Sequence, residues 1–351
     1  MFTIDYGRAT LVIKNITDAF IMRQFPFGGA LRPQDAVEIV GQPIEKALFW
    51  FYACHYMRGA INSTMAIRKL SHMRKEEPSL FIPEQAMGMD KETLEKYLRN
   101  RINYHSRQIA NFWVENSRLL VEHFEGDPRA IYNGKDDYRT ISDIIANKRV
   151  RVGKKSMNGF AGFHGFQRKM SGMLTYFLLD QGLIREAKFD MAIDFHIIRV
   201  LVTNQVLVAK NRSFRYTDTV QVAALDALAH FYKKHPEYSP LTVCDAVWLL
   251  SSTLCNKSPW NKGFDITGEK TESRRGHMRE NGITPSVRKK DLLLALPFEN
   301  IGWNHAGWMK TGVAQRDSFA TCGRCPACGT CQYGIPSWDY YQKGIFILRE
   351  K

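Results

Sequence analysis

The residue types most suited to chemistry occur in two short motifs near the middle of the chain. The first is the run Gly162-Phe163-His164-Gly165-Phe166-Gln167-Arg168-Lys169-Met170, which leads into an apolar helix predicted over residues 170–183. The N-terminus of a helix presents unpaired backbone N–H groups and the positive end of the helix dipole. Because Arg168 and Lys169 add two cations at this point, the motif predicts a phosphate-binding site.

The second motif is Ala192-Ile193-Asp194-Phe195-His196, which opens another apolar helix predicted over residues 195–208. An aspartate here is most often an N-cap, whose side chain accepts hydrogen bonds from backbone N–H groups. A carboxylate near bound phosphates can instead accept a proton or stabilise a developing cation. Lys169 is either a nucleophilic amine or a contact to phosphate. We expect Asp194 and Lys169 to be catalytic, with the cap and the phosphate contact as alternatives.

The composition favours a polyanionic partner. The chain has 351 residues, with 49 Lys and Arg against 35 Asp and Glu and a net charge of +14. Such a charge favours nucleic acid, since phosphate contacts release counterions, although solubility alone is the simpler explanation. No apolar run approaches the roughly 20 residues that span a bilayer, and no signal-peptide pattern begins the sequence. We expect a cytoplasmic monomer that binds double-stranded DNA and no membrane.

Periodicity and capping residues predict a mainly helical chain. Asp90 is suited to cap one helix, Thr217-Asp218 another, and Ser239-Pro240 a third. The sequence Glu125-Gly126-Asp127-Pro128 suits the end of a long amphipathic helix. Only the alternating run Thr10-Leu11-Val12-Ile13 indicates a short strand. The remaining helices are predicted over residues 44–57, 58–73, 103–124 and 241–255.

The two motifs together resemble the helix-hairpin-helix DNA glycosylase superfamily. Phe163 to Lys169 is similar to the hairpin turn of that family, and Ile193-Asp194-Phe195-His196 is similar to the segment with its catalytic aspartate. The resemblance covers roughly residues 44–255. It implies an all-α, two-lobed fold with a six-helix core over residues 44–200. Residues 1–43 and 201–351 would form a second helical lobe, which includes a long basic insertion at 256–321.

The resemblance also implies which residues contact DNA. Two departures from the family pattern matter: Gln167 replaces the second glycine of the hairpin, and Gly59 stands where a glutamine usually wedges into the duplex. Arg58 or Asn62 would have to fill the gap left by an extruded base. The basic run over residues 147–162 is either a solvated loop or a phosphate contact. The expected DNA-binding residues are Gly165, Gln167, Arg168, Lys169, Lys154, Lys155, Arg58, Asn62, Arg274 and Arg275.

The cysteines form the other strong pattern. Cys322, Cys325, Cys328 and Cys331 recur at every third residue, a spacing at which thiolates can converge on zinc or an iron–sulfur cluster. Residues 248–255, ending in Cys255, resemble the helix that carries the first cluster ligand of iron–sulfur glycosylases. The fourth family cysteine is absent, so Cys322 or Cys325 would replace it. We expect a structural [4Fe–4S] cluster, with Zn²⁺ as the alternative; Cys54 and Cys244 are predicted buried thiols.

Within the superfamily, residues 160–179 and the basic insertion are similar to the phage thymine-hypermodification branch. These enzymes are the alpha-glutamyl/putrescinyl thymine pyrophosphorylases, or amino acid:DNA transferases. The resemblance implies that an amine or amino acid, for example glycine, is attached to the methyl carbon of 5-(pyro)phosphomethyl-deoxyuridine in duplex DNA. The site of action would be the host cytoplasm for a phage-encoded chain.

Two other functions fit the same motifs. The first is a DNA glycosylase with lyase action through Lys169, which would excise a modified or damaged base. The second is a non-catalytic DNA-binding protein in which the hairpin grips phosphate and Asp194 is only a helix cap. All three interpretations require DNA, so turnover rather than binding distinguishes them.

The cysteine pattern makes a spectroscopic prediction. Protein purified without oxygen should be brown, with a broad visible absorption that bleaches on reduction, because iron–sulfur charge-transfer bands lie in the visible range. Cys328→Ser and Cys331→Ser should lose this absorption and the bound iron, whereas Cys244→Ser should keep both. A colourless protein that holds zinc would contradict the cluster.

Overall fold

The protein is mostly helical in the computed structural model, which confirms the predicted all-α class. None of the described helices is both long and apolar enough to cross a bilayer. Two compact units make up the chain: Met1–Ala30 with Ile193–Lys351, and Leu31–Ala192. The residues described are 2–30, 32–57, 61, 63–135, 137–146, 160–185, 192–210, 213–215, 218–254, 325–327, 330 and 345–347.

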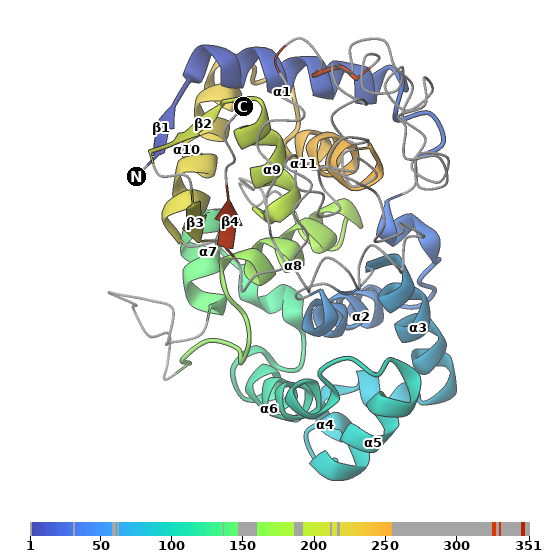
Figure 1. The fold of residues 1–351 in the computed structure, drawn as a ribbon. Helices are drawn as coiled ribbons and strands as arrows, with labels where there is room; N and C mark the ends of the chain where they lie inside the picture. Colours follow the sequence, from blue (N-terminus) through green and yellow to red (C-terminus); the bar gives the residue numbers. More distant parts are fainter. Residues whose placement is uncertain are drawn as a thin grey trace. The chain divides into compact units, whose positions relative to one another are not determined.

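The first unit joins the start of the chain to its later part. Its helix α1 (Tyr6–Ile21) packs on α10 (Asp218–Lys234) and α11 (Pro240–Leu249), and α9 (Phe195–Thr203) packs on α11. A π-helical turn, η5 (Leu250–Leu254), continues α11 (Figure 1). Two small antiparallel pairs complete the described part: β1 (Phe2–Ile4) with β2 (Leu207–Ala209), and β3 (Ser213–Arg215) with β4 (Ile345–Ile347).

The strand predicted over Thr10-Leu11-Val12-Ile13 is wrong, because these residues lie within α1. The helix buries Ala9, Val12, Ile13 and Ile16, whose spacing of three and four residues forms one helical face. Asp5 is the N-cap, and its carboxylate accepts a hydrogen bond from the backbone N–H of Arg8 at 2.8 Å. The four-residue alternation was therefore a fragment of a longer helical repeat.

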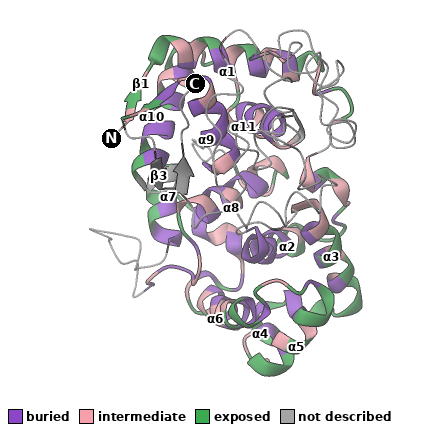
Figure 2. Ribbon diagram, viewed as in Figure 1, coloured by how far each residue is buried: buried purple, intermediate pink, exposed green. Residues whose placement is uncertain are grey.

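The second unit is built around α2, whose residues are mostly buried (Figure 2). It packs on α3, α6 and α8, and α5 packs along α6. Short turns of helix connect the longer ones. In order, the elements are η1 (Pro33–Ala36), α2 (Pro43–Tyr56), α3 (Ser63–Glu76), η2 (Pro78–Phe81), α4 (Pro83–Ala86), α5 (Lys91–Arg101), α6 (Ser106–Phe124), η3 (Pro128–Tyr132), α7 (Tyr138–Ile145) and α8 (Arg168–Asp180).

Aromatic side chains of α2 hold this unit together. Trp50 stacks on Phe177 of α8 with ring centroids 4.4 Å apart, and Tyr52 stacks on Trp113 of α6 at the same separation. Phe51 meets Phe163, in the predicted hairpin turn, edge to face at 5.0 Å. Such pairs add to the free energy gained by burying their large apolar surfaces. The hairpin turn is thus packed onto the central helix of the core.

Several predicted helix ends are confirmed and others are shifted. Asp90 caps α5 by accepting a hydrogen bond from the N–H of Thr93 at 2.8 Å, and α6 ends at left-handed Glu125 followed by Gly126. The helix predicted over 195–208 stops at Thr203. Gln205 has a positive φ of 55°, and the following residues pair as β2 with β1.

The two units divide the chain between residues 30 and 31 and between 192 and 193. The boundaries predicted from the sequence lie at 43/44 and 200/201. Lys169 therefore belongs to the second compact unit and Asp194 to the first.

Candidate functional site

The predicted hairpin is a tight turn over Phe163, His164, Gly165 and Phe166. The N–H of Phe166 donates to the carbonyl of Phe163 at 3.2 Å, and Gly165 has a φ of +77°. A residue with a side chain rarely adopts this conformation, so the turn requires glycine at this position. The N–H of Phe163 also donates to the carbonyl of Ile145, the last residue of α7, at 2.9 Å.

A buried side-chain network fixes both peptide groups of His164 in this turn. The Oδ1 of Asn116, on α6, accepts from the N–H of His164 at 2.7 Å, and its Nδ2 donates to the His164 carbonyl at 3.0 Å. The same Nδ2 lies 2.9 Å from Nε2 of His55 on α2. Nδ1 of His55 lies 3.1 Å from two backbone carbonyls, so it carries the proton and Nε2 accepts. This network joins α2, α6 and the turn.

Asn116 and His55 are not among the residues predicted from the sequence. Both are buried, at 0 % and 1 % exposure, on helical faces that are mostly apolar. A buried amide or imidazole costs free energy unless it is hydrogen-bonded, so polar residues on an apolar stripe signal a specific partner. The sequence alone does not show that this partner is a turn 48 residues further along the chain.

Helix α8 begins directly after the turn, with Gln167 as its N-cap residue. The side chain of Gln167 makes no capping hydrogen bond, and its backbone is extended, with φ −118° and ψ −179°. Any residue adopts this conformation, so glutamine at position 167 fits the turn without strain. Gly165, Gln167, Arg168 and Lys169, predicted to act together, lie in one continuous turn and first helical turn.

Lys169 lies in the first turn of α8 and is half-buried. Its charge acts on Cys54 of α2: burial raises the pKa of that thiol, and the Lys169 ammonium opposes the rise. Cys54 itself is buried, as predicted, and so is Cys244. A cation at the helix mouth favours an anion there, because the helix dipole and the ammonium act in the same sense.

Asp194 is the N-cap of α9. Its Oδ1 accepts from the backbone N–H groups of His196 at 2.8 Å and Ile197 at 3.2 Å, and its Oδ2 accepts from the indole Nε1 of Trp248 at 3.2 Å. The residue is buried, with 6 % of its surface exposed. Capping occupies mainly Oδ1, whereas Oδ2 has accepting capacity beyond the single indole hydrogen bond, because a carboxylate oxygen accepts at two positions.

Two buried polar side chains that follow Asp194 on α9 contact the π-helical turn η5. Ser251 of that turn has its Oγ 3.0 Å from Nδ1 of His196 and 3.4 Å from a guanidinium nitrogen of Arg199. The Arg199 guanidinium also lies over the ring of Phe195, 5.1 Å from its centroid. π-Helical turns occur often at functional sites, where they displace side chains from the regular helical register. Here the turn places the hydroxyl of Ser251 within hydrogen-bonding distance of His196 and Arg199, two buried polar residues of α9.

Of the five predicted cysteine ligands, Cys325 lies among the described residues and is half-buried. The nearby Thr330 donates from Oγ1 to Oδ1 of Asn204, at the end of α9, at 2.7 Å. The described residues contain no group of three or more potential metal ligands. The other predicted residues lie outside the described residues: Cys255, Cys322, Cys328, Cys331, Arg58, Asn62, Lys154, Lys155, Arg274 and Arg275.

No protein-family model matches the sequence, and no curated protein matches it either. Function is therefore inferred from the local geometry of the two motifs. One is a braced turn that leads into a helix with cations at its N-terminus. The other is a buried carboxylate at the start of a second helix.

The network at the turn makes a stability prediction. Asn116→Ala would leave the N–H and carbonyl of His164 and the Nε2 of His55 without their partner, so unfolding free energy should fall by about 2–4 kcal/mol. Urea denaturation measures this loss, and hydrogen exchange should be faster at the His164 amide. Asn111→Ala, at an exposed position of the same helix, should change stability by less than about 0.5 kcal/mol. Equal effects of the two substitutions would contradict the role of Asn116.

Proposed function

We propose that the chain is a DNA-modifying transferase. It would attach an amine or amino acid, for example glycine, to the methyl carbon of 5-(pyro)phosphomethyl-deoxyuridine in duplex DNA. The observation that carries the proposal is the braced turn of residues 163–166, which leads into a helix N-terminus with Arg168 and Lys169. The proposal includes a two-lobed fold of the helix-hairpin-helix glycosylase type and a C-terminal cysteine cluster.

The turn would hold the DNA backbone. The side chain of the N-cap residue Gln167 accepts no hydrogen bond from the first N–H groups of α8, and Lys169 adds positive charge beside them. A phosphate there accepts from backbone N–H groups without any dependence on base sequence. Such contacts set the register of the protein on the duplex, while the modified base supplies selectivity. The net charge of +14 supports this binding at long range.

Asp194 would serve the displacement step. The amine nitrogen forms a bond to the exocyclic methylene carbon, and the bond from that carbon to the (pyro)phosphate oxygen breaks. The leaving group takes the electron pair, and the proton lost by the ammonium goes to Oδ2 of Asp194. The same carboxylate would stabilise positive charge on the methylene carbon if departure precedes attack. The target base would have to leave the stack for an active site to enclose its methylene carbon.

The cysteine cluster would have a structural role. Thr330, just beyond Cys325 and Cys328 in the sequence, is hydrogen-bonded to Asn204 at the C-terminal end of α9. A cluster at 322–331 would thereby be connected to the helix that Asp194 caps. An iron–sulfur cluster or zinc ion would fix this segment without taking part in the displacement.

The proposal predicts a covalent product. Wild-type protein incubated with duplex DNA that bears 5-(pyro)phosphomethyl-deoxyuridine and mixed amino acids should yield an aminated nucleoside by mass spectrometry. Asp194→Asn should lower the rate by at least about 100-fold while DNA affinity is kept, because general base catalysis is lost. Asp90→Asn, which alters the exposed cap of α5, is the matched control and should retain full activity.

Two outcomes would contradict the transferase. If wild type gives no aminated product and borohydride traps a covalent adduct on abasic duplex that Lys169→Ala abolishes, the protein is a glycosylase/lyase. If neither reaction occurs and Asp194→Asn binds DNA as wild type does, the protein is a non-catalytic DNA binder.

A further inference from the structure

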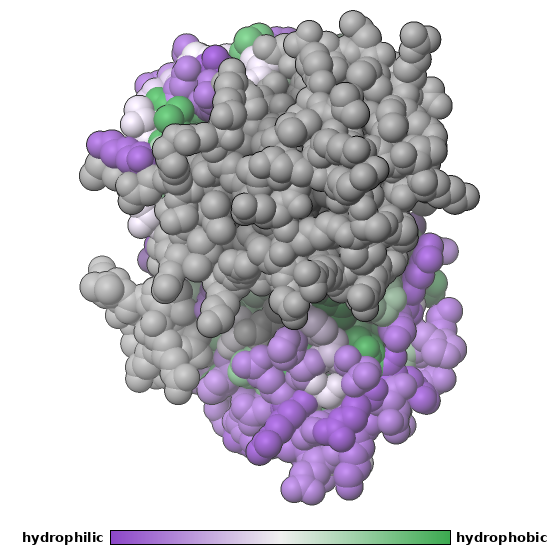
Figure 3. All heavy atoms as spheres, viewed as in Figure 1, coloured by the Kyte–Doolittle hydropathy of each residue, from purple (hydrophilic) through white to green (hydrophobic). Residues whose placement is uncertain are grey.

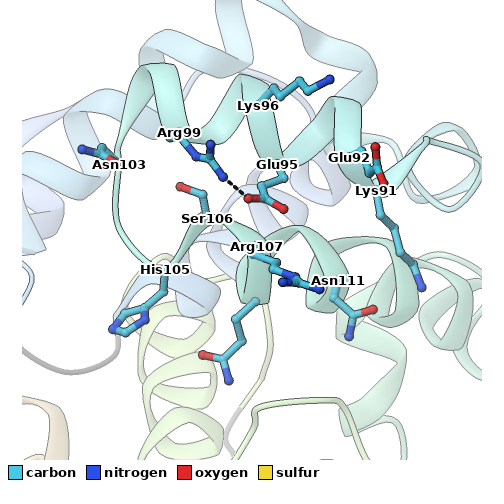
Figure 4. A pocket seen from close by; sticks show the side chains of 11 residues that line it. Lys91, Glu92, Glu95, Lys96, Arg99, Asn103, His105, Ser106, Arg107 and Asn111 are labelled. Carbon is cyan, nitrogen blue, oxygen red and sulfur yellow. Dashed lines mark hydrogen bonds and ion pairs between the residues drawn. The ribbon is translucent and has the colours of Figure 1, made fainter.

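A hydrophilic groove lies between α5 and the start of α6, within the second unit. It encloses a cavity of about 1070 Å³, and polar and charged side chains of both helices line it (Figure 4). In the space-filling view this part of the surface is strongly hydrophilic (Figure 3). The groove is separate from the hairpin turn, although α6 serves both. Ser106 at its start and Asn116 at the turn are ten positions apart, about 15 Å along the helix axis.

Ser106 is the unusual residue of this groove. It is 7 % exposed, and its Oγ is buried without a hydrogen-bond partner among the described residues. Serines inside helices donate to the carbonyl one turn earlier, but Ser106 is the first residue of α6 and has no such carbonyl. Its side chain points between the two helices (Figure 4). Buried hydroxyls are nearly always hydrogen-bonded, so this one indicates a partner that occupies the groove.

The backbone at the same point also lacks acceptors. The first intrahelical hydrogen bond of α6 runs from the N–H of Ile109 to the carbonyl of His105 at 3.0 Å. Helix geometry leaves the N–H groups of residues 106–108 without helical partners. The N-cap residue His105 is left-handed, with a φ of 46°, and its side chain makes no capping hydrogen bond. The positive end of a 19-residue helix therefore faces the groove without a cap.

The charges of the groove favour an anion. Glu95 is paired with Arg99 and Lys91 with Glu115, so these lining charges are already balanced, and among the described residues two cations and the Glu92 carboxylate are left. Lys96 and Arg107 make no ion pair with any described residue, and Arg107 adjoins Ser106 in the first turn of α6. Four cations and two carboxylates make up the charged lining: Lys91, Lys96, Arg99, Arg107, Glu92 and Glu95.

We propose that this groove binds a phosphate group at the N-terminus of α6. The hydroxyl of Ser106 and the first N–H groups of the helix donate hydrogen bonds to it, and Arg107 and Lys96 balance its charge. The phosphate belongs either to a nucleic-acid backbone or to free phosphate or pyrophosphate, which share this chemistry. The site does not depend on Asp194 or on the proposed reaction.

The test uses the full chain and two kinds of probe. Calorimetric titration measures inorganic phosphate and pyrophosphate binding, and fluorescence anisotropy measures binding of an unmodified duplex. Ser106→Ala and Arg107→Ala should each weaken binding about tenfold. The first removes a hydrogen-bond donor to the anion, and the second removes a positive charge beside it. Arg118→Ala is the matched control, because Arg118 lies on α6 away from the groove and is paired with Glu115.

The stability of the Ser106→Ala variant distinguishes a role of Ser106 in ligand binding from a role in folding. Because its hydroxyl has no partner within the described protein, Ser106→Ala should leave the urea midpoint unchanged or raise it while affinity falls. Weaker phosphate and pyrophosphate binding in the groove variants identifies a free anion; weaker duplex binding alone identifies the nucleic-acid backbone. Unchanged affinity for every probe in both variants would overturn the proposal. These binding measurements need no turnover, so they stand or fall separately from the transferase.

Discussion

The hairpin depends on one buried amide, the side chain of Asn116, which holds both peptide groups of His164. Asn116 both accepts from and donates to the backbone of His164, while His55 receives the remaining proton of that amide. An unpaired peptide group in this apolar core would cost as much free energy as several favourable packing contacts supply. The turn is therefore fixed against α2 and α6, and α8 begins two residues after it, at Arg168.

A fixed turn matters because a helix N-terminus binds an anion best when its N–H groups already point at the site. The stacked rings of α2, α6 and α8 provide the rigid support, with Trp50 against Phe177 and Tyr52 against Trp113. Asp194 follows the same principle in the other unit. Its cap of α9 and the indole of Trp248 hold the carboxylate in one orientation, so little reorganisation would accompany a charge that develops beside it.

The sequence predicted those features that depend on near neighbours. The helical class, the cap at Asp90 and the glycine at position 165 follow from periodicity, capping and turn chemistry. The strand at Thr10–Ile13 was wrong because four residues cannot distinguish an alternation from part of a helical face. The partners of Asn116 and Ser106 could not be predicted, since one is a distant turn and the other would be a ligand. The boundaries of the two units could not be predicted either, because they depend on contacts between segments that are distant in the sequence.

The central claim is that the N-terminus of α8 contacts the phosphates of DNA, and the salt dependence of duplex binding tests it most directly. Each phosphate contact contributes about 0.9 to the slope of log affinity against log salt concentration. Replacing both cations, Arg168→Ala with Lys169→Ala, should reduce the slope by about 2 for any duplex sequence. The matched pair Lys233→Ala with Lys234→Ala, exposed in the last turn of α10, should leave it unchanged. An unaltered slope in the Arg168 and Lys169 variant would show that the turn does not bind DNA.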